Sequence, residues 1–208
     1  MKFNNDTNDP RYTELKKIYE EVLNLKKSPL YTYRTENNYH PVIGEGSHYA
    51  GIMFIGEAPG ENEAKTGRPF AGAAGRILDE LLTSIEASRK DVYITNIVKD
   101  RPPKNRDPLP EEIELYAPYL DRQINIIKPN CIATLGRYSM SYIMEHYGLK
   151  DQLRSISALH GKKFIITYGG KTITYIPLYH PAVALYTGSI KKVMFEDFKI
   201  LKQFLNNH

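Results

Sequence analysis

The chain has 208 residues, of which 41% are hydrophobic and 25% are charged, a balance that excludes a fibrous or largely disordered protein and suffices for one buried core. Its formal net charge of +4 is compatible with a polyanionic partner, although ordinary basic proteins share this value. The single cysteine, Cys131, excludes an internal disulfide and any site that needs several thiolates.

The N-terminal half predicts two helices and two strands. An amphipathic helix over about residues 11–26 carries apolar side chains at helical spacing, opposite a charged face. The run GIMFIG at 51–56 is bounded by glycine and predicts a buried strand, from which a turn-rich bend leads into a helix over 73–85. A short strand at 92–98 and a proline-rich loop at 100–110 follow.

The C-terminal half continues the alternation. A helix begins near Pro110, a third strand lies at 131–136, and a helix over 137–147 comes after it. The segment 162–181 has β-branched and aromatic runs around two glycines, which predict either a hairpin or the approach to a final sheet strand. The closing stretch, 188–205, is expected to be helical.

Strands separated by helices indicate an α/β fold, with a parallel sheet covered on both faces. We expect a single domain over residues 1–208, with the N-terminal helix packed on it. No stretch approaches the ~18 apolar residues that span a bilayer. The first ten residues lack a basic start followed by an apolar core, so a cytoplasmic protein without membrane contact is expected.

Three loops follow the predicted strands and are the candidates for a binding site. They are GEAPG at 56–60, TNIVKDRPP at 95–103 and YHPAVALY at 179–186. In parallel sheets of this kind, ligands bind beyond the carboxyl ends of the strands. A strand end rich in glycine and proline is also often only a turn, so each loop alone is weak support.

The first loop lets a ligand approach the backbone closely. Gly56 and Gly60 leave room for this approach, and Glu57 stands at the strand end. The loop lacks both the Gly-Lys-Ser/Thr ending of a phosphate loop and the G-x-G-x-x-G pattern of dinucleotide binding. The small neighbours of Phe70 would leave its ring face open for a flat heterocycle to stack on, although Phe70 is equally acceptable as a core residue.

The other two loops each contribute one polar candidate. Asn96 ends a strand, and its amide places a donor beside an acceptor, which matches the edge of uracil and not that of cytosine. His180 is followed by a proline that fixes its backbone, and a neutral imidazole there can donate to an oxygen that gains negative charge. Each residue alone is more often a turn residue or a satisfied structural group.

Taken together, three long segments in this order and spacing resemble the family 4 uracil-DNA glycosylases and their close relatives. They are GEAPGENEAKTGRPFAGAAGRILDELL, YITNIVKDRPPKNRDPLPEEI and YHPAVALY. The resemblance runs from about residue 11 to the C-terminus. It implies a three-layer α/β/α sandwich with a central, mostly parallel, four-stranded sheet. It also implies excision of uracil from DNA as the first step of base excision repair, by a monomer acting on single- or double-stranded substrate.

The resemblance assigns roles to the candidate residues. Gly56, Ala58 and Gly60 would present backbone to the uracil, Phe70 would stack on it, and Asn96 would read its edge. His180 would face the O2 atom of the base and stabilise the uracil anion, and Glu57 would orient the attacking water or offset positive charge on the sugar. We expect Glu61 and Glu63 to be solvated surface acids.

The same resemblance suggests how DNA would be held. Leu185 and Tyr186 are the apolar candidates for a wedge that fills the gap left by a flipped base. Relatives usually carry arginine near Tyr186, so phosphate anchoring is expected at Lys191 or Lys192 instead. The proline-rich loop offers further phosphate contacts at Arg101, Lys104 and Arg106. The alternative is that this loop is only a solvated basic turn.

Family members hold a 4Fe-4S cluster on four cysteines, and this chain departs from that pattern. Leu25, Ser28, Asp100 and Ala117 stand at the corresponding positions, so no ligand remains and no cluster is predicted. Asp100 could pair with Lys26 or Lys27 instead. The histidines show no metal-binding spacing, and the chemistry needs no cofactor and no metal.

Two alternatives from other classes stay open. A protein of the same fold could bind a deaminated base without turnover or with altered specificity, although Glu57, Asn96 and His180 are all present. An unrelated nucleotide-binding α/β protein could hold a phosphate on the glycine-rich loop, but the missing Lys-Ser/Thr pair disfavours it.

Overall fold

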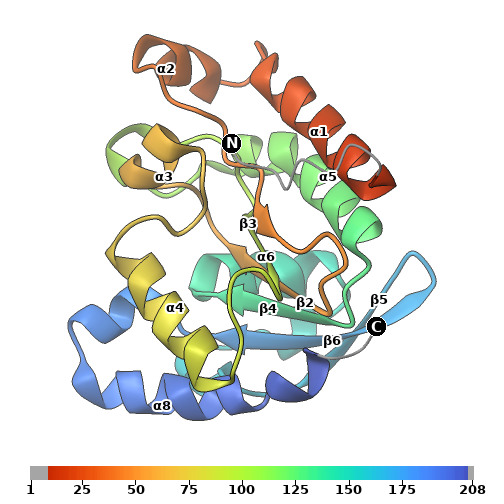
Figure 1. The fold of residues 1–208 in the computed structure, drawn as a ribbon, viewed down its shortest axis with the longest axis vertical. Coiled ribbons are helices and arrows are strands. Elements are labelled where there is room, and N and C mark those ends of the chain that lie inside the picture. The colour runs from red at the N-terminus through yellow and green to blue at the C-terminus, as the bar shows by residue number, and fades with distance from the viewer. Residues whose placement is uncertain (1–8, 206–208) are drawn as a thin grey trace.

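The computed structural model describes residues 9–205, and its centre is a mixed sheet. Its strands are β1 (Glu45–Gly46), β2 (Ile52–Gly56), β3 (Tyr93–Asn96), β4 (Cys131–Leu135), β5 (Phe164–Tyr168) and β6 (Lys171–Leu178). They lie in the order β1-β3-β2-β4-β6-β5 (Figure 1). The inner strands β3, β2, β4 and β6 run parallel to one another, whereas β1 and β5 are antiparallel to their neighbours.

The α/β class and the mostly parallel sheet are confirmed, but the expected number of four strands is wrong, because the sheet has six. The additional strands lie at the edges. β1 consists of two residues paired with β3, which is too short to produce a periodic pattern in the sequence. β5 forms a hairpin with β6 through Gly169 and Gly170, both at positive φ, so segment 162–181 contains both a hairpin and the last inner strand.

Helices cover both faces of the sheet. The α-helices are α1 (Pro10–Leu23), α2 (Leu30–Glu36), α3 (Glu61–Thr66), α4 (Ala73–Ser84), α5 (Pro110–Ile127), α6 (Arg137–His146), α7 (Ile156–Leu159) and α8 (Gly188–Lys199). The 3-10 turns are η1 (Pro103–Asn105), η2 (Lys150–Gln152), η3 (Pro181–Leu185) and η4 (Lys202–Phe204). Helices α1, α5 and α6 pack on one face and α4 and α8 on the other (Figure 1).

Local chemistry explains where the helices begin. The Asp9 carboxylate accepts from the Arg11 amide at 2.9 Å and caps α1. Pro110 is the first residue of α5, and the Glu112 carboxylate accepts from the Leu109 amide at 2.8 Å. The predicted ends were too late for two helices, since α1 stops at Leu23 and α8 at Lys199, and η4 follows after α8.

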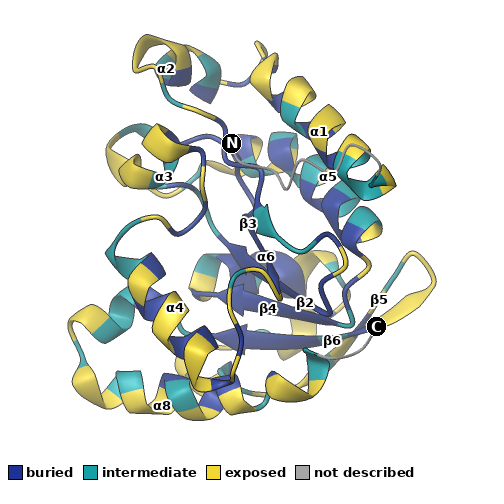
Figure 2. Ribbon diagram, in the orientation of Figure 1, coloured by how far each residue is buried: buried dark blue, intermediate teal, exposed yellow. Residues whose placement is uncertain are grey.

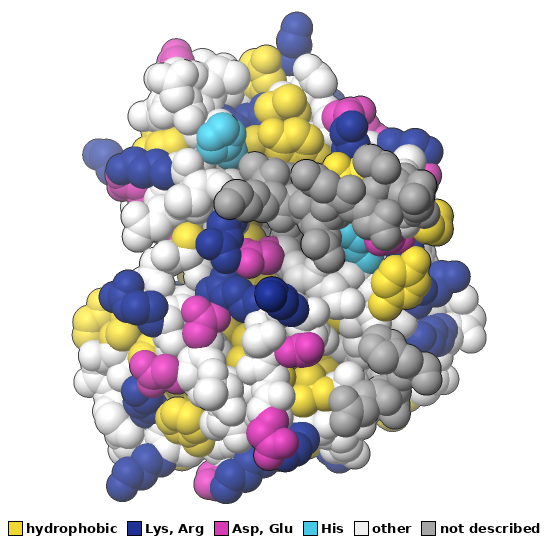
Figure 3. All heavy atoms as spheres, in the orientation of Figure 1, with side chains coloured by type: hydrophobic (Ala, Val, Ile, Leu, Met, Phe, Trp, Pro, Cys, Tyr) yellow, Lys and Arg dark blue, Asp and Glu magenta, His cyan; other side chains and the backbone are white. Residues whose placement is uncertain are grey.

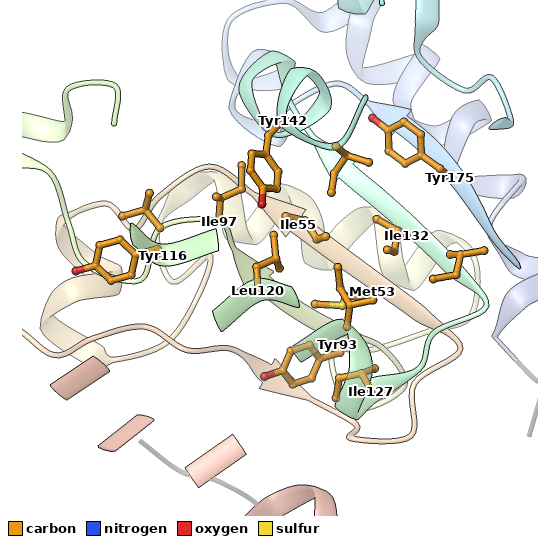
Figure 4. Packing of buried hydrophobic residues seen from close by; sticks show 14 of the residues in the cluster. Met53, Ile55, Tyr93, Ile97, Tyr116, Leu120, Ile127, Ile132, Tyr142 and Tyr175 are labelled. Atoms are coloured by element: carbon orange, nitrogen blue, oxygen red, sulfur yellow. The ribbon is translucent and has the colours of Figure 1, made fainter. Parts of the chain in front are cut away.

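Alternate residues of the strands supply two separate cores. Met53 and Ile55 point to the cluster that contains α5, where Figure 4 shows them together with Leu120. Ile52 and Phe54 belong to the cluster under α4 and α8. All of β2 is buried, as are the inner strands in general (Figure 2), which is why the sequence reads as continuous apolar runs.

In the described part of the chain, no helix combines the length and the hydropathy that crossing a bilayer requires. The expectation about a leader segment rests on residues 1–10, and residues 1–8 of these lie outside the described residues.

Candidate active site

Loops at the carboxyl ends of β2, β3 and β6 surround a cavity of about 290 Å³. The predicted base-contacting and catalytic residues that line it are Glu57, Ala58, Gly60, Phe70, Asn96 and His180. Gly56, the last residue of β2, lies against two of them. The topology is the reason, because parallel strands bring their carboxyl ends to the same edge of the sheet.

Gly56, Asn96 and Phe70 are packed against one another. Gly56 and Asn96 are partners in the parallel register of β2 and β3. A Cβ atom on Gly56 would lie 2.3 Å from Asn96 Oδ1 and 3.0 Å from the Phe70 ring. A residue other than glycine would therefore displace both side chains from the edge of the cavity.

Phe70 lies in the turn before α4 and has a positive φ of 51°. Its ring centroid is 5.7 Å from that of His180, with 31° between the two ring planes. Phe70 is only 6% exposed, which agrees with the alternative that it is also a core residue. The ring packs beside Gly56 and in the cluster under α4, and it lines the cavity from there.

Asn96 is buried at the end of β3, next to a buried lysine that sequence reasoning missed. The Lys99 ammonium donates to the Asn96 carbonyl at 2.5 Å, to Thr95 Oγ1 at 2.9 Å and to Gln123 Oε1 at 2.5 Å. Burial lowers the pKa of Lys99 well below its ordinary value. These bonds hold the main chain at Asn96, and no local pattern marks a lysine that folds back in this way.

His180 has one ring nitrogen occupied by the main chain. The Ala182 amide donates to His180 Nδ1 at 3.1 Å, so in the neutral ring the hydrogen is on Nε2. Burial lowers the pKa of His180, and the nearby Glu63 acts in the opposite direction. The side chain is therefore a neutral imidazole with an Nε2–H donor, in the wall of the cavity.

Glu57 stands in the same cavity beside a second carboxylate. Burial and the charge of Asp107 raise the pKa of Glu57 to about 7, while Arg137 acts to lower it. Asp107 itself accepts a hydrogen bond from the Tyr138 hydroxyl. Sequence reasoning missed Asp107, which lies in the proline-rich loop and reaches the cavity only because this loop folds over it.

The expectation that Glu61 and Glu63 are both surface acids is half right. Glu61 is exposed and pairs with Lys65 at 2.5 Å. Glu63 is partly buried and lines the cavity, and its Oε1 atom accepts from the amides of Ala71 and Gly72 at 2.7 and 3.0 Å. The bend between α3 and α4 brings these amides to Glu63, which sequence spacing alone does not reveal.

Two of the predicted phosphate contacts, both in the proline-rich loop, have their guanidinium groups engaged with other side chains of the protein. Arg101 is 7% exposed and donates to Tyr39 Oη and Asn105 Oδ1, both at 2.7 Å. Arg106 makes a bidentate contact with the Glu112 carboxylate at 2.6 and 2.9 Å. The alternative of a solvated basic turn therefore does not hold for Arg101, whose buried guanidinium stabilises the loop through Asn105.

The remaining DNA-contact candidates lie on the surface. Lys104 is exposed, and Lys191 pairs with Glu80 at 2.6 Å. Leu185, at the end of η3, is 43% exposed, and Tyr186, the next residue, is 88% exposed. On the face seen in Figure 3, basic and acidic side chains are interspersed, so this view contains no continuous basic stripe.

The positions at which the related family carries cluster cysteines do not fit an iron-sulfur cluster in this chain. Such a cluster requires thiolates, and the one cysteine, Cys131, is buried in β4. Ser28 Oγ instead lies 2.8 Å from the Tyr116 hydroxyl, which donates to Asp100 Oδ2 at 2.6 Å. Among residues 9–205, no three His, Cys, Asp or Glu side chains form a group that could hold a metal ion.

Asp100 pairs with an arginine and not with the lysines expected from the sequence. Arg34 Nε lies 3.5 Å from Asp100 Oδ1, and both side chains are buried. Lys26 and Lys27 are exposed. The expectation was wrong because it considered only residues close to the family's first cysteine pair, whereas α2 brings Arg34 back to the proline-rich loop.

Comparison with known proteins agrees with this geometry. The Uracil DNA glycosylase superfamily matches residues 43–200. The chain is 49% identical to the type-4 uracil-DNA glycosylase of Sulfurisphaera tokodaii, covering 91% of this chain and 84% of the relative. It is 47% identical to the type-4 enzyme of Saccharolobus solfataricus, covering 91% and 86% of the two chains. For the type-4 enzyme of Archaeoglobus fulgidus the identity is 43%, with 88% of each chain covered. The chain therefore belongs to the uracil-DNA glycosylase superfamily, within its type-4 branch.

Proposed function

We propose that this chain, as a member of the type-4 branch, hydrolyses the N-glycosidic bond of uracil in DNA and so initiates base excision repair. The observation that carries the proposal is the shared cavity, in which Phe70, Asn96 and His180 meet Glu57 at the strand ends. The aromatic ring can stack on the base, and the amide can read its edge. The neutral imidazole can stabilise the uracil anion, and the carboxylate can activate water.

Asn96 selects the base in this proposal. Its amide accepts from uracil N3–H and donates to uracil O4, whereas cytosine presents the reverse pattern. The side chain is buried between the end of β3 and Gly56, so a mismatched base leaves polar groups unpaired. Each such group costs about 1 to 3 kcal/mol. Phe70 stacks on the base, and the backbone at Gly56, Ala58 and Gly60 completes the pocket.

His180 stabilises the leaving group. Breaking the bond between N1 and C1′ leaves negative charge on uracil, which spreads to O2. The Nε2–H of neutral His180 donates to that oxygen, and the Ala182 amide keeps the ring in the required tautomer. A preorganised donor of this kind contributes about 2.7 to 4 kcal/mol to the lowering of the barrier.

Glu57 acts on the sugar side. In its ionised form, it orients the attacking water or offsets the positive charge that develops at C1′. Water attack adds hydroxyl to C1′, and the other proton of that water passes to the Glu57 carboxylate and from there to solvent. The uracil anion takes up a proton from solvent, so the products are an abasic site and free uracil. Burial, aided by the charge of Asp107, raises the pKa of Glu57 to about 7, which places its ionisation near neutral pH.

DNA reaches the cavity with its target nucleotide flipped out. Leu185 and Tyr186 are exposed just after His180, where apolar side chains can fill the vacated space in a duplex. Lys104 and Lys191 are the phosphate contacts of the proposal, with Arg106 beside the cavity. Monomeric state and cytoplasmic location stay predictions from the sequence.

The test is release of uracil from a labelled oligonucleotide by the wild type and by Asn96→Asp. We expect the wild type to produce abasic sites at uracil in single strands and in U:G pairs, with parallel substrates carrying thymine, hypoxanthine or xanthine defining its range. Asn96→Asp loses the donor to O4, so uracil excision falls and discrimination against cytosine weakens.

Wild-type protein that binds the uracil oligonucleotide without releasing the base would contradict the catalytic proposal and favour a binding protein of the same fold. Unchanged selectivity in Asn96→Asp would remove Asn96 from the reading role alone.

A further inference from the structure

The turn that carries Phe70 has its main chain held by two charged side chains from different elements. Arg89 donates to the Pro69 carbonyl at 2.8 Å and to the Phe70 carbonyl at 2.6 Å. Glu63, on α3, accepts from the amides of the next two residues at 2.7 and 3.0 Å. The main-chain groups of residues 69–72 are therefore all hydrogen-bonded to one guanidinium or one carboxylate.

This turn has a conformation that needs such support. Phe70 has φ of 51°, in the left-handed region that a phenylalanine rarely adopts. Its carbonyl is also pressed against α4, since a Cβ atom on Gly75 would lie 1.7 Å from the Phe70 oxygen. A carbonyl enclosed in this way depends on a donor that reaches it, and Arg89 is that donor.

Arg89 is itself fixed in orientation. Its Nε atom donates to Asp79 Oδ1 at 2.6 Å, and Glu45 Oε2 lies 3.6 Å from Nη1. The side chain is 15% exposed, so the guanidinium is largely withdrawn from water. It comes from the loop between α4 and β3, and its carbonyl contacts join that loop to the turn before α4. A lysine could not reproduce this planar set of donors.

We propose that Arg89 is a positioning residue for the glycosylase reaction, which holds the turn so that the Phe70 ring stays in the wall of the base cavity, with Glu63 as the second anchor of that turn. The inference rests on the proposed function, in which uracil stacks on Phe70. Without Arg89 the Phe70 carbonyl loses its partner, the turn relaxes from its left-handed conformation, and the ring moves from beside His180.

The experiment is a double-mutant cycle of Arg89→Met and Phe70→Ala, with single-turnover uracil release and DNA affinity as readouts. We expect Arg89→Met to slow release about 10²-fold, the scale of misplacement by a remote change, with little change in DNA affinity. In the Phe70→Ala background, Arg89→Met should add little further loss, because its target ring is gone. Asp79→Asn is the matched control, since it removes the negative charge that faces Arg89 and leaves both carbonyl contacts.

Thermal unfolding of each variant separates positioning from general stability. Release at the wild-type rate by folded Arg89→Met would overturn the inference, as would equal losses with and without the Phe70 ring. If Arg89→Met does not fold, Arg89→Lys enters the same cycle with the same expected pattern, because a single ammonium nitrogen lacks the planar fork with which the guanidinium reaches both carbonyls and Asp79 at once. Wild type without uracil release would overturn the proposed function and the inference together, whereas an active wild type with an unaffected Arg89 variant would overturn the inference alone.

Discussion

At the residue scale, burial moves two titratable groups of the cavity, His180 and Glu57, toward their neutral forms, with different consequences. It lowers the pKa of His180, so the imidazole stays uncharged at neutral pH and can donate from Nε2. It raises the pKa of Glu57 to about 7, aided by Asp107, so this carboxylate ionises close to the working range. The same buried cavity thus contains a neutral donor, His180, and a base, Glu57, whose ionisation changes near neutral pH.

The position of Glu57 predicts a pH profile. Its ionised form is the active one in our proposal, so kcat/KM for uracil release should rise with pH through about 7 and level off above it. Glu57→Gln should lower the plateau and remove this limb. Steady-state rates from pH 5 to pH 9 on one oligonucleotide provide the measurement. If kcat/KM of Glu57→Gln still rose with pH through about 7, the ionisation would belong to another group.

The residues that face the cavity from strand ends could be predicted from sequence, whereas those that support them could not. Glu57, Asn96 and His180 each follow an apolar run, and topology brings such positions together. Asp107 and Glu63 reach the cavity only because the segments that carry them fold back toward it. Arg89 contacts the turn that holds Phe70 from a different loop of the chain. Their partners are main-chain groups or residues in other segments, which leave no local pattern.

At the element scale, a buried polar network ties the N-terminal helices to the proline-rich loop. Ser28, just before α2, and Tyr116, on α5, share a hydrogen bond, and Asp100 joins Tyr116 to Arg34. Burial raises the pKa of Asp100 to about 6, while Arg34 and the Tyr116 hydrogen bond act to lower it. These three segments are connected here by polar side chains in place of metal ligands.

The Asp100 shift predicts how stability depends on pH. An acid with a folded-state pKa near 6, above its ordinary 3.8, binds more protons in the folded state between these values. Its contribution is fully present below about 3.8 and is lost as the pH rises through about 6. The free energy of unfolding of wild type relative to Asp100→Asn should therefore fall over this interval and stay flat above it.

Urea unfolding of both proteins from pH 4 to pH 8 checks this prediction, and Asn24→Ala, a change at an exposed residue after α1, serves as the control. A difference between wild type and Asp100→Asn that rises with pH in this window would mean that pairing with Arg34 outweighs burial.

Long elements were easier to predict than short ones. The continuous apolar runs of β2 and β4 and the proline and acids that open α5 are local signals, and each element occurs where expected. The two-residue β1 exists only because β3 offers it an edge, and the bend at Asn24 shortens the first helix. Such features depend on tertiary contacts that a sequence window does not contain.

At the scale of the whole molecule, the choice between duplex and single-stranded DNA depends, in our proposal, on the exposed side chains that follow His180 in the chain. Leu185, the last residue of η3, and Tyr186, which follows it, are both exposed, whereas Phe70 and Asn96 in the cavity wall are buried. A net charge of +4 with interspersed acids gives only moderate general attraction to phosphate (Figure 3). We therefore expect local contacts near the flipped base to carry more of the recognition than a broad basic surface.

This arrangement predicts a substrate-dependent loss. Leu185→Ala with Tyr186→Ala should slow uracil release from duplex DNA by roughly tenfold or more, because unstacking costs a few kcal/mol that a wedge offsets. Release from a single strand, where no stack has to be opened, should change little. Parallel time courses on a U:G duplex and the matching single strand give the ratio, and equal losses on both would contradict the wedge.

The most direct test of the whole account is single-turnover uracil release by His180→Ala beside the wild type, with DNA affinity measured on the same oligonucleotide. If the cavity receives an extruded uracil and His180 stabilises its anion, release slows by about 10²- to 10³-fold while affinity is nearly unchanged. A His180→Ala protein that releases uracil at the wild-type rate would contradict the account.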